Sequence, residues 1–179
     1  MINDYEAIRP ITTDAYIPSL DLRDSTISTL NGLIAICKDG EAGFREAADN
    51  VERADLKSLF VELSTQRSTF ITGLQTLVDS MGGSPSDSGH ISAALHRAWI
   101  NVKGAFTGMD DGATLAECER AEDNAKTAYN DALQEDLPDF VRETVQKQYY
   151  SVIAAHDRVK ALRDEANAPK SNTARPGLM

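Results

Sequence analysis

The sequence predicts an all-α fold, a four-helix bundle built from two antiparallel helix hairpins. Apolar residues recur at steps of three and four in four long stretches, which is the spacing of one helix face. No stretch alternates with period two over β-branched residues, as a half-buried strand would. The 179 residues are 41% hydrophobic with only 6 Pro and 11 Gly, so the chain can bury the core of one ordinary domain.

The first predicted hairpin joins a helix over residues 25–51 to a helix over 54–81. Asp24 or Ser25 suits the N-cap of the first helix, because both side chains accept hydrogen bonds from free backbone N–H groups. The second helix ends at a Gly-Gly pair with Pro85 just beyond, a typical stop signal. Since only a few residues separate the two helices, we expect them to lie antiparallel.

The second predicted hairpin joins helices over 112–135 and 137–166, with Pro138 in the first turn of the last helix. A short crossover helix is expected over 89–104, between the two hairpins. Such a connection can span the bundle and bring the helix over 112–135 parallel to the helix over 54–81. This connectivity is that of ferritin-like bundles.

The two ends of the chain differ in composition from the predicted bundle, which spans residues 24–167. Residues 1–23 are apolar but interrupted by prolines, so we expect an extended arm that packs on the bundle or on a neighbouring chain. Residues 168–179 are small and polar, which predicts a flexible tail. Exposed apolar arms and long bundle faces commonly pair, so we expect a homo-oligomer, most simply a dimer. The arm or the tail could also bind a protein partner.

The charge balance excludes some partners. Acidic residues outnumber basic ones 28 to 18 and give a net charge of -10, which opposes binding to nucleic acid or to anionic membranes. No signal peptide and no run of 18 apolar residues is seen, so a cytoplasmic protein without a membrane span is expected. Cys37 and Cys118 have no CxxC partner and are predicted to be reduced thiols.

A few polar residues interrupt the apolar stripes at the middle of the predicted bundle. Folding each hairpin about its turn brings Glu41 close to Arg67, which suggests an ion pair, and brings Glu119 within reach of His156. The predicted buried polar layer consists of Glu41, Arg67, Glu119, Glu122, Gln148 and His156.

Two interpretations of this layer stay open. In the first, it is a set of paired polar groups that fixes the register of the helices. In the second, it binds iron or manganese, because carboxylates and imidazole are the ligands of di-iron and di-manganese bundles. The proposed ligands are Glu41, Glu119, Glu122 and His156. The Glu-x-x-His spacing of those bundles is absent, so no cofactor is assigned.

Several runs of residues resemble a known family. LNGLIAICKDGEAGFREAA, LKSLFVELSTQRSTF and LAECERAEDNAKTAY are similar in order and spacing to the bacterial four-helix-bundle family called domain of unknown function 2383. The resemblance implies a ferritin-like fold, and because the family's biochemical function is not established it assigns no catalytic residues to this chain. We expect a non-enzymatic structural or interaction protein, and a role in the response to stress is one form that this function could take. The alternative is a metal-binding carboxylate bundle with a redox or metal-handling role.

Overall fold

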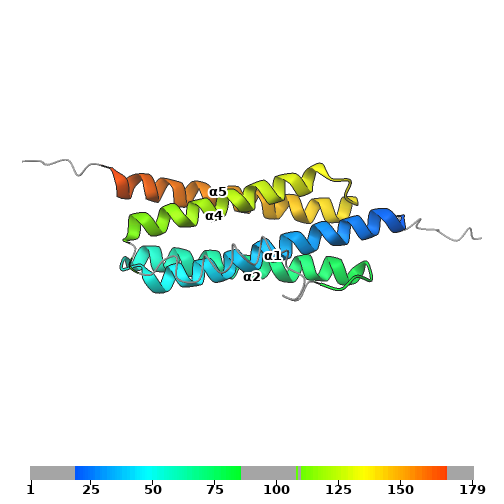
Figure 1. Ribbon diagram of the computed structural model, residues 1–179, viewed down its shortest axis with the longest axis horizontal. Helices are drawn as coiled ribbons and strands as arrows, with labels where there is room; N and C mark the ends of the chain where they lie inside the picture. The colour runs from blue at the N-terminus through cyan, green and yellow to red at the C-terminus, as the bar shows by residue number, and fades with distance from the viewer. Residues whose placement is uncertain (1–18, 86–107, 109, 169–179) are drawn as a thin grey trace, which may run out of the picture.

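Figure 1 shows the computed structural model, which describes residues 19–85, 108 and 110–168. The described residues form helices and turns, with no strand among them. The all-α four-helix fold that the sequence predicts is confirmed. The helices are α1 (Leu20–Asn50), α2 (Ala54–Ser80), α4 (Asp111–Gln134) and α5 (Asp139–Asn167).

Helix α1 begins earlier than the sequence analysis expected. The Oγ of Ser19 accepts a hydrogen bond from the backbone N–H of Leu22 at 3.3 Å, so Ser19 is the N-cap rather than Asp24 or Ser25. The extended arm predicted over residues 1–23 is therefore wrong for its last part, which belongs to α1. Ser19 follows Pro18 in the sequence, and the apolar stripe gives no sign of this cap because Leu20 and Asp21, the first residues of α1, are exposed.

Helix α2 ends at a glycine turn, as the sequence predicts. Gly82 has a φ of 71°, a left-handed conformation that a residue without Cβ adopts without strain. The N–H of Gly82 donates to the carbonyl of Asp79 at 2.9 Å, and the N–H of Gly83 donates to the carbonyl of Val78 at 3.0 Å. These bonds satisfy carbonyls that the end of a helix leaves free.

The two hairpins lie against each other lengthwise (Figure 1). The backbone N–H of Glu52, in the turn between α1 and α2, donates to Asp111 Oδ1 at the start of α4 at 3.2 Å. Both α2 and α4 therefore begin at the same end of the bundle, and they run parallel, as predicted. Helix α1 packs mainly on α2 and α4 mainly on α5, while α1 also contacts α4 and α2 contacts α5.

The turn between α4 and α5 is closed by an arginine that the sequence analysis did not single out. Arg142, in the first turn of α5, donates from Nη1 to the carbonyl of Leu133 and from Nη2 to the carbonyl of Glu135, both at 2.8 Å. A cation at the end of a helix satisfies free carbonyls and complements the helix dipole. This contact holds α5 antiparallel to α4.

The apolar core is divided into two clusters along the bundle. One is built around Leu30, Leu74, Tyr129 and Val145, and the other around Phe44, Phe60 and Leu115. Along α2, the buried residue Arg67 lies between the residues of one cluster and those of the other, and Glu122 does the same along α4. A polar layer therefore separates the two halves of the core.

Three expectations fall outside the residues that the structure describes. They are the crossover helix over 89–104, the arm before residue 19 and the tail after residue 168. Among the described helices, none is long and apolar enough to cross a membrane.

Candidate functional site

The centre of the polar layer is a buried ion pair between α2 and α4. Nη2 of Arg67 lies 2.5 Å from Oε1 and 2.6 Å from Oε2 of Glu122, and both side chains are 2% exposed. Burial by itself lowers the pKa of Arg67, but the Glu122 carboxylate, with smaller contributions from Cys37 and Tyr129, raises the pKa above its ordinary value. Arg67 is therefore a buried cation that is neutralised by Glu122.

Aromatic rings enclose the Arg67 guanidinium. Its central carbon lies 6.0 Å from the ring centre of Phe44 and 5.4 Å from that of Phe70, distances at which cation–π attraction adds to the ion pair. Nη1 of Arg67 is buried and has no hydrogen-bond partner among the described residues. The pair is well enclosed, but it does not satisfy every donor of the guanidinium.

Glu41 is not the partner of Arg67, which corrects the expected ion pair between them. The Glu41 side chain is 25% exposed and accepts a hydrogen bond from Arg45, one turn further along α1, at 3.0 Å. Gly40 lies beside the Arg67 stem instead, and a Cβ there would meet Cγ and Cδ of Arg67 at 3.4 Å, an ordinary contact distance. The Arg67 side chain therefore passes over the bare backbone at Gly40 and reaches α4.

The other residues of the predicted layer are buried, but they belong to separate groups. Gln148 accepts a hydrogen bond at Oε1 from the Tyr129 hydroxyl at 2.7 Å and donates from Nε2 to the carbonyl of Phe70 at 3.3 Å. Cys37 Sγ lies 3.1 Å from the same hydroxyl. Burial raises the pKa of Tyr129, so the hydroxyl stays protonated and can donate. This group joins α1, α2, α4 and α5.

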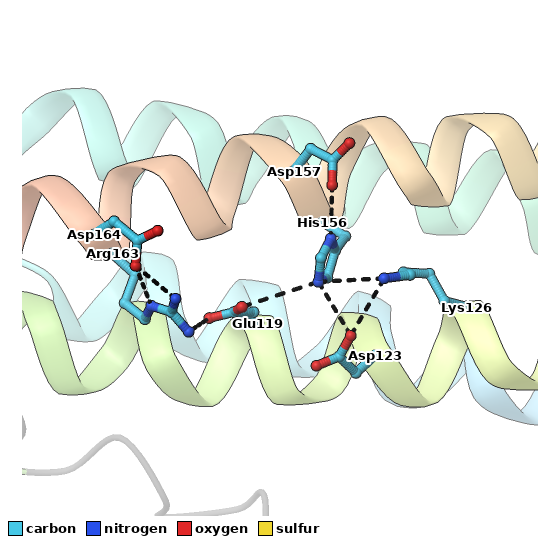
Figure 2. Close-up of polar contacts among 7 residues, drawn as sticks. All are labelled: Glu119, Asp123, Lys126, His156, Asp157, Arg163 and Asp164. Carbon is cyan, nitrogen blue, oxygen red and sulfur yellow. Dashed lines mark hydrogen bonds and ion pairs between the residues drawn. The ribbon is translucent and has the colours of Figure 1, made fainter.

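The second group gathers around His156 on α5 (Figure 2). Its Nε2 lies 3.1 Å from Oδ1 of Asp123 and 3.9 Å from Oε1 of Glu119, both on α4. The predicted proximity of Glu119 and His156 is thus confirmed. Asp123 was missed because its side chain is 56% exposed and stands off the apolar stripe. Its spacing of four residues from Glu119 is the signal that could have found it.

Two cations border this group. Lys126 Nζ lies 3.4 Å from His156 Nε2 and 3.4 Å from Asp123 Oδ1. Arg163 forms an ion pair with Oε2 of Glu119. The five side chains form a charged seam between α4 and α5, and Figure 2 shows them pointing toward one another.

The polar layer does not fit a two-metal carboxylate centre. Such a centre needs carboxylates from facing helices and Glu-x-x-His pairs, which place several oxygens and two imidazoles around the ions. Here the guanidinium of Arg67 stands at the centre, neutralises Glu122 and opposes a cation. The single described imidazole, His156, bonds carboxylates of the α4 and α5 seam, and Glu41 turns toward solvent. The four ligands predicted from the sequence therefore do not converge.

A groove of about 560 Å³ runs between α1 and α4 beside the Arg67–Glu122 pair. Small residues on both helices keep it open, and its lining is mostly apolar. Asp39 lines this groove and is half-buried, and burial raises its pKa from 3.8 to about 6. The groove therefore contains a carboxyl group that titrates near neutral pH.

Replacing Asp39 by Asn should change the pH dependence of stability. Because the folded-state pKa lies above the ordinary value, protonated Asp39 favours the folded state. That contribution is complete below about pH 4 and is lost as the pH rises through about 6. We expect Asp39→Asn to raise the free energy of unfolding at pH 7 by on the order of 1 kcal/mol, after allowing for solvent screening, with little change at pH 4. Urea unfolding at both pH values measures it, and an equal effect at both would contradict the assignment.

Both cysteines are free and buried. Burial raises the pKa of Cys37 and of Cys118, which lowers the fraction of reactive thiolate. We expect neither thiol to react quickly with a disulfide reagent in the native protein, and both to react once the chain is unfolded in guanidinium. Rapid labelling of one thiol under native conditions would show that its helix opens locally.

The comparisons with known proteins agree with this fold. The two helix hairpins, with α2 and α4 parallel, define a four-helix bundle, and a solved structure with a ferritin-like domain shares this fold. The family model of the domain of unknown function DUF2383 matches residues 25–135, which is more than half of the chain. The protein therefore belongs to the DUF2383 family, as the resemblance seen in its sequence predicts.

A solved structure with a ferritin-like domain is also similar to this chain. It is a two-domain protein from Anabaena variabilis ATCC 29413 that contains DJ-1/ThiJ/PfpI-like and ferritin-like domains. The TM-score is 0.65 at 11% sequence identity, and the match covers 88% of this chain and 42% of that chain. At this identity the likeness concerns the fold alone. No curated protein matches the chain.

Proposed function

We propose that this protein is a non-enzymatic structural or interaction bundle. The observation that carries the proposal is the buried Arg67–Glu122 pair, which occupies the bundle core between two helices, the kind of place where carboxylate bundles hold their metals. A guanidinium in that place neutralises one carboxylate and leaves no set of free ligands around it. The layer is therefore suited to holding helices together.

The pair connects the two hairpins, since Arg67 comes from α2 and Glu122 from α4. A sliding of one hairpin along the other would leave two buried charges without partners, which costs several kcal/mol. An apolar layer would tolerate such a shift much better. The pair therefore supports one register of the hairpins, and this is the role that we assign to it.

The proposal is tested by loading the purified protein with iron or manganese and measuring bound metal and ferrous-ion oxidation. We expect no two-ion stoichiometry and no oxidation faster than that of the buffer control. Two ions per chain that disappear in Glu122→Gln would overturn the proposal. An ion that depends on His156 and not on Glu122 would leave it intact, because that ion would lie outside the central layer.

We propose further that the protein associates with itself as a dimer. We also propose that it is a bacterial protein of the cytoplasm. The two free thiols are in keeping with a reducing compartment. Light scattering during size-exclusion chromatography should give twice the chain mass of 19.5 kDa, and the mass of a monomer would contradict the dimer.

A further inference from the structure

The seam between α4 and α5 brings three potential metal ligands together outside the central layer. One ligand atom each from Glu119, Asp123 and His156 lies within 4.8 Å of the other two. Glu119 and Asp123 are one turn apart on α4, so their carboxylates lie on the same face toward His156 of α5 (Figure 2). The side chains of His156 and Glu119 are 7% and 9% exposed.

The imidazole of His156 is oriented as a ligand. Its Nδ1 lies 2.9 Å from Oδ1 of Asp157, so we assign the Nδ1 proton to a hydrogen bond with that carboxylate. The lone pair of Nε2 then points toward Asp123 and Glu119. A carboxylate that accepts from one ring nitrogen, while the other nitrogen binds the ion, is the usual support of a metal-binding histidine.

With the Nδ1 proton given to Asp157, three acceptor atoms converge here, and a proton on Nε2, the Lys126 ammonium or a metal ion can lie between them. The Lys126 ammonium is held only weakly in this place, because its 3.4 Å contacts are longer than a charge-assisted hydrogen bond of about 2.8 Å. The Lys126 side chain is 32% exposed, so its ammonium can move into solvent. Arg163 bonds the other oxygen of Glu119, Oε2, and leaves Oε1 directed at His156.

We propose that Glu119, Asp123 and His156 bind one divalent transition-metal ion of the Zn²⁺ type, which replaces the Lys126 ammonium. An imidazole nitrogen with two carboxylate oxygens is a ligand set that Zn²⁺ accepts. Neighbouring ligands in a tetrahedral site with bonds of about 2.0 Å lie about 3.3 Å apart. The distances from His156 Nε2 to the two carboxylates, 3.1 and 3.9 Å, bracket that value. The ion would clip α4 to α5 and leave a fourth position for water.

Calorimetric titration of the full chain with zinc chloride tests this site. We expect one equivalent to bind, and His156→Ala or Asp123→Asn to weaken binding by more than about tenfold. Lys126→Met should tighten binding several-fold because it removes the competing charge. Asp131→Asn is the matched control, since Asp131 is an exposed carboxylate of α4 outside the cluster. The chain has two other histidines, so a His90→Ala/His96→Ala variant must retain the zinc.

Absence of zinc binding in the native chain would overturn the proposal, and so would binding that survives both His156→Ala and Asp123→Asn. Asp123 is exposed, so its variant keeps the fold even where loss of the buried imidazole disturbs it. Circular dichroism of each variant verifies the helices. Because the readout depends on Asp123 and His156, failure here leaves the proposed role of the Arg67–Glu122 pair untouched.

Discussion

Arg67→Leu alone should lower the free energy of unfolding by about 3 to 5 kcal/mol. The substitution leaves the Glu122 carboxylate buried at 2% exposure without its only cationic hydrogen-bond donor among the described residues. Removing both charges with Arg67→Leu/Glu122→Leu should restore most of that loss, or exceed it, because no charge then remains buried. Unfolding in urea, followed by circular dichroism, measures the three proteins.

Lys147→Leu is the control for the Arg67 experiment. Lys147 pairs with Glu143 at 2.6 Å, but both side chains are more than two-thirds exposed, so we expect a change within about 0.5 kcal/mol. If the double variant were as unstable as Arg67→Leu, the packing of the arginine stem against Phe44, Phe70 and Gly40 would be its main contribution. The proposed role of the charge pair in setting the register would then be wrong.

Phe60→Ala should also destabilise the protein by about 3 to 5 kcal/mol. The Phe60 ring is completely buried and stacks on that of Phe44, with ring centres 6.1 Å apart. Its removal takes apolar surface out of the second core cluster and leaves a cavity in a helix interface that cannot fully collapse. Thermal unfolding should show a clearly lower melting temperature with unchanged helix content at 20 °C.

Val61 provides a neighbouring control for the Phe60 experiment. Its side chain lies one position further along α2 and the residue is 54% exposed, so Val61→Ala should change stability by no more than about 0.5 kcal/mol. Similar losses in the two variants would mean that Val61, and not only Phe60, faces the core, which would contradict the rotation of α2 in this structure.

The helices could be predicted from the sequence because helix signals are local. The stripe of apolar residues marks the buried face, and caps such as Asp110 act within one turn. The burial of Arg67, Glu122 and Gln148 followed from the same periodicity, and Glu119 and His156, at the margins of their stripes, are buried as well. Glu41 does not follow this prediction. The apolar stripe is a face about 100° wide, and residues at its edge turn toward solvent or core according to their neighbours.

The partners of the buried side chains could not be predicted in the same way. The register within a hairpin follows from its short turn, and it placed Glu119 beside His156 correctly. The contact of Arg67 with Glu122 crosses from one hairpin to the other, where no short turn sets the register. Asp123 is part of the seam although its side chain is exposed, and a search for polar residues in buried stripes does not find exposed residues.

The sequence by itself determined an all-α bundle of two hairpins, its family, and most of its buried polar residues, because periodicity and caps depend on neighbours within a turn or two. Only the tertiary structure decided that Arg67 pairs with Glu122 and passes over Gly40, and that Asp123 completes a group with Glu119 and His156. The physical reason is that these contacts depend on the rotation and axial offset of whole helices. Packing sets both quantities, and no local pattern encodes them.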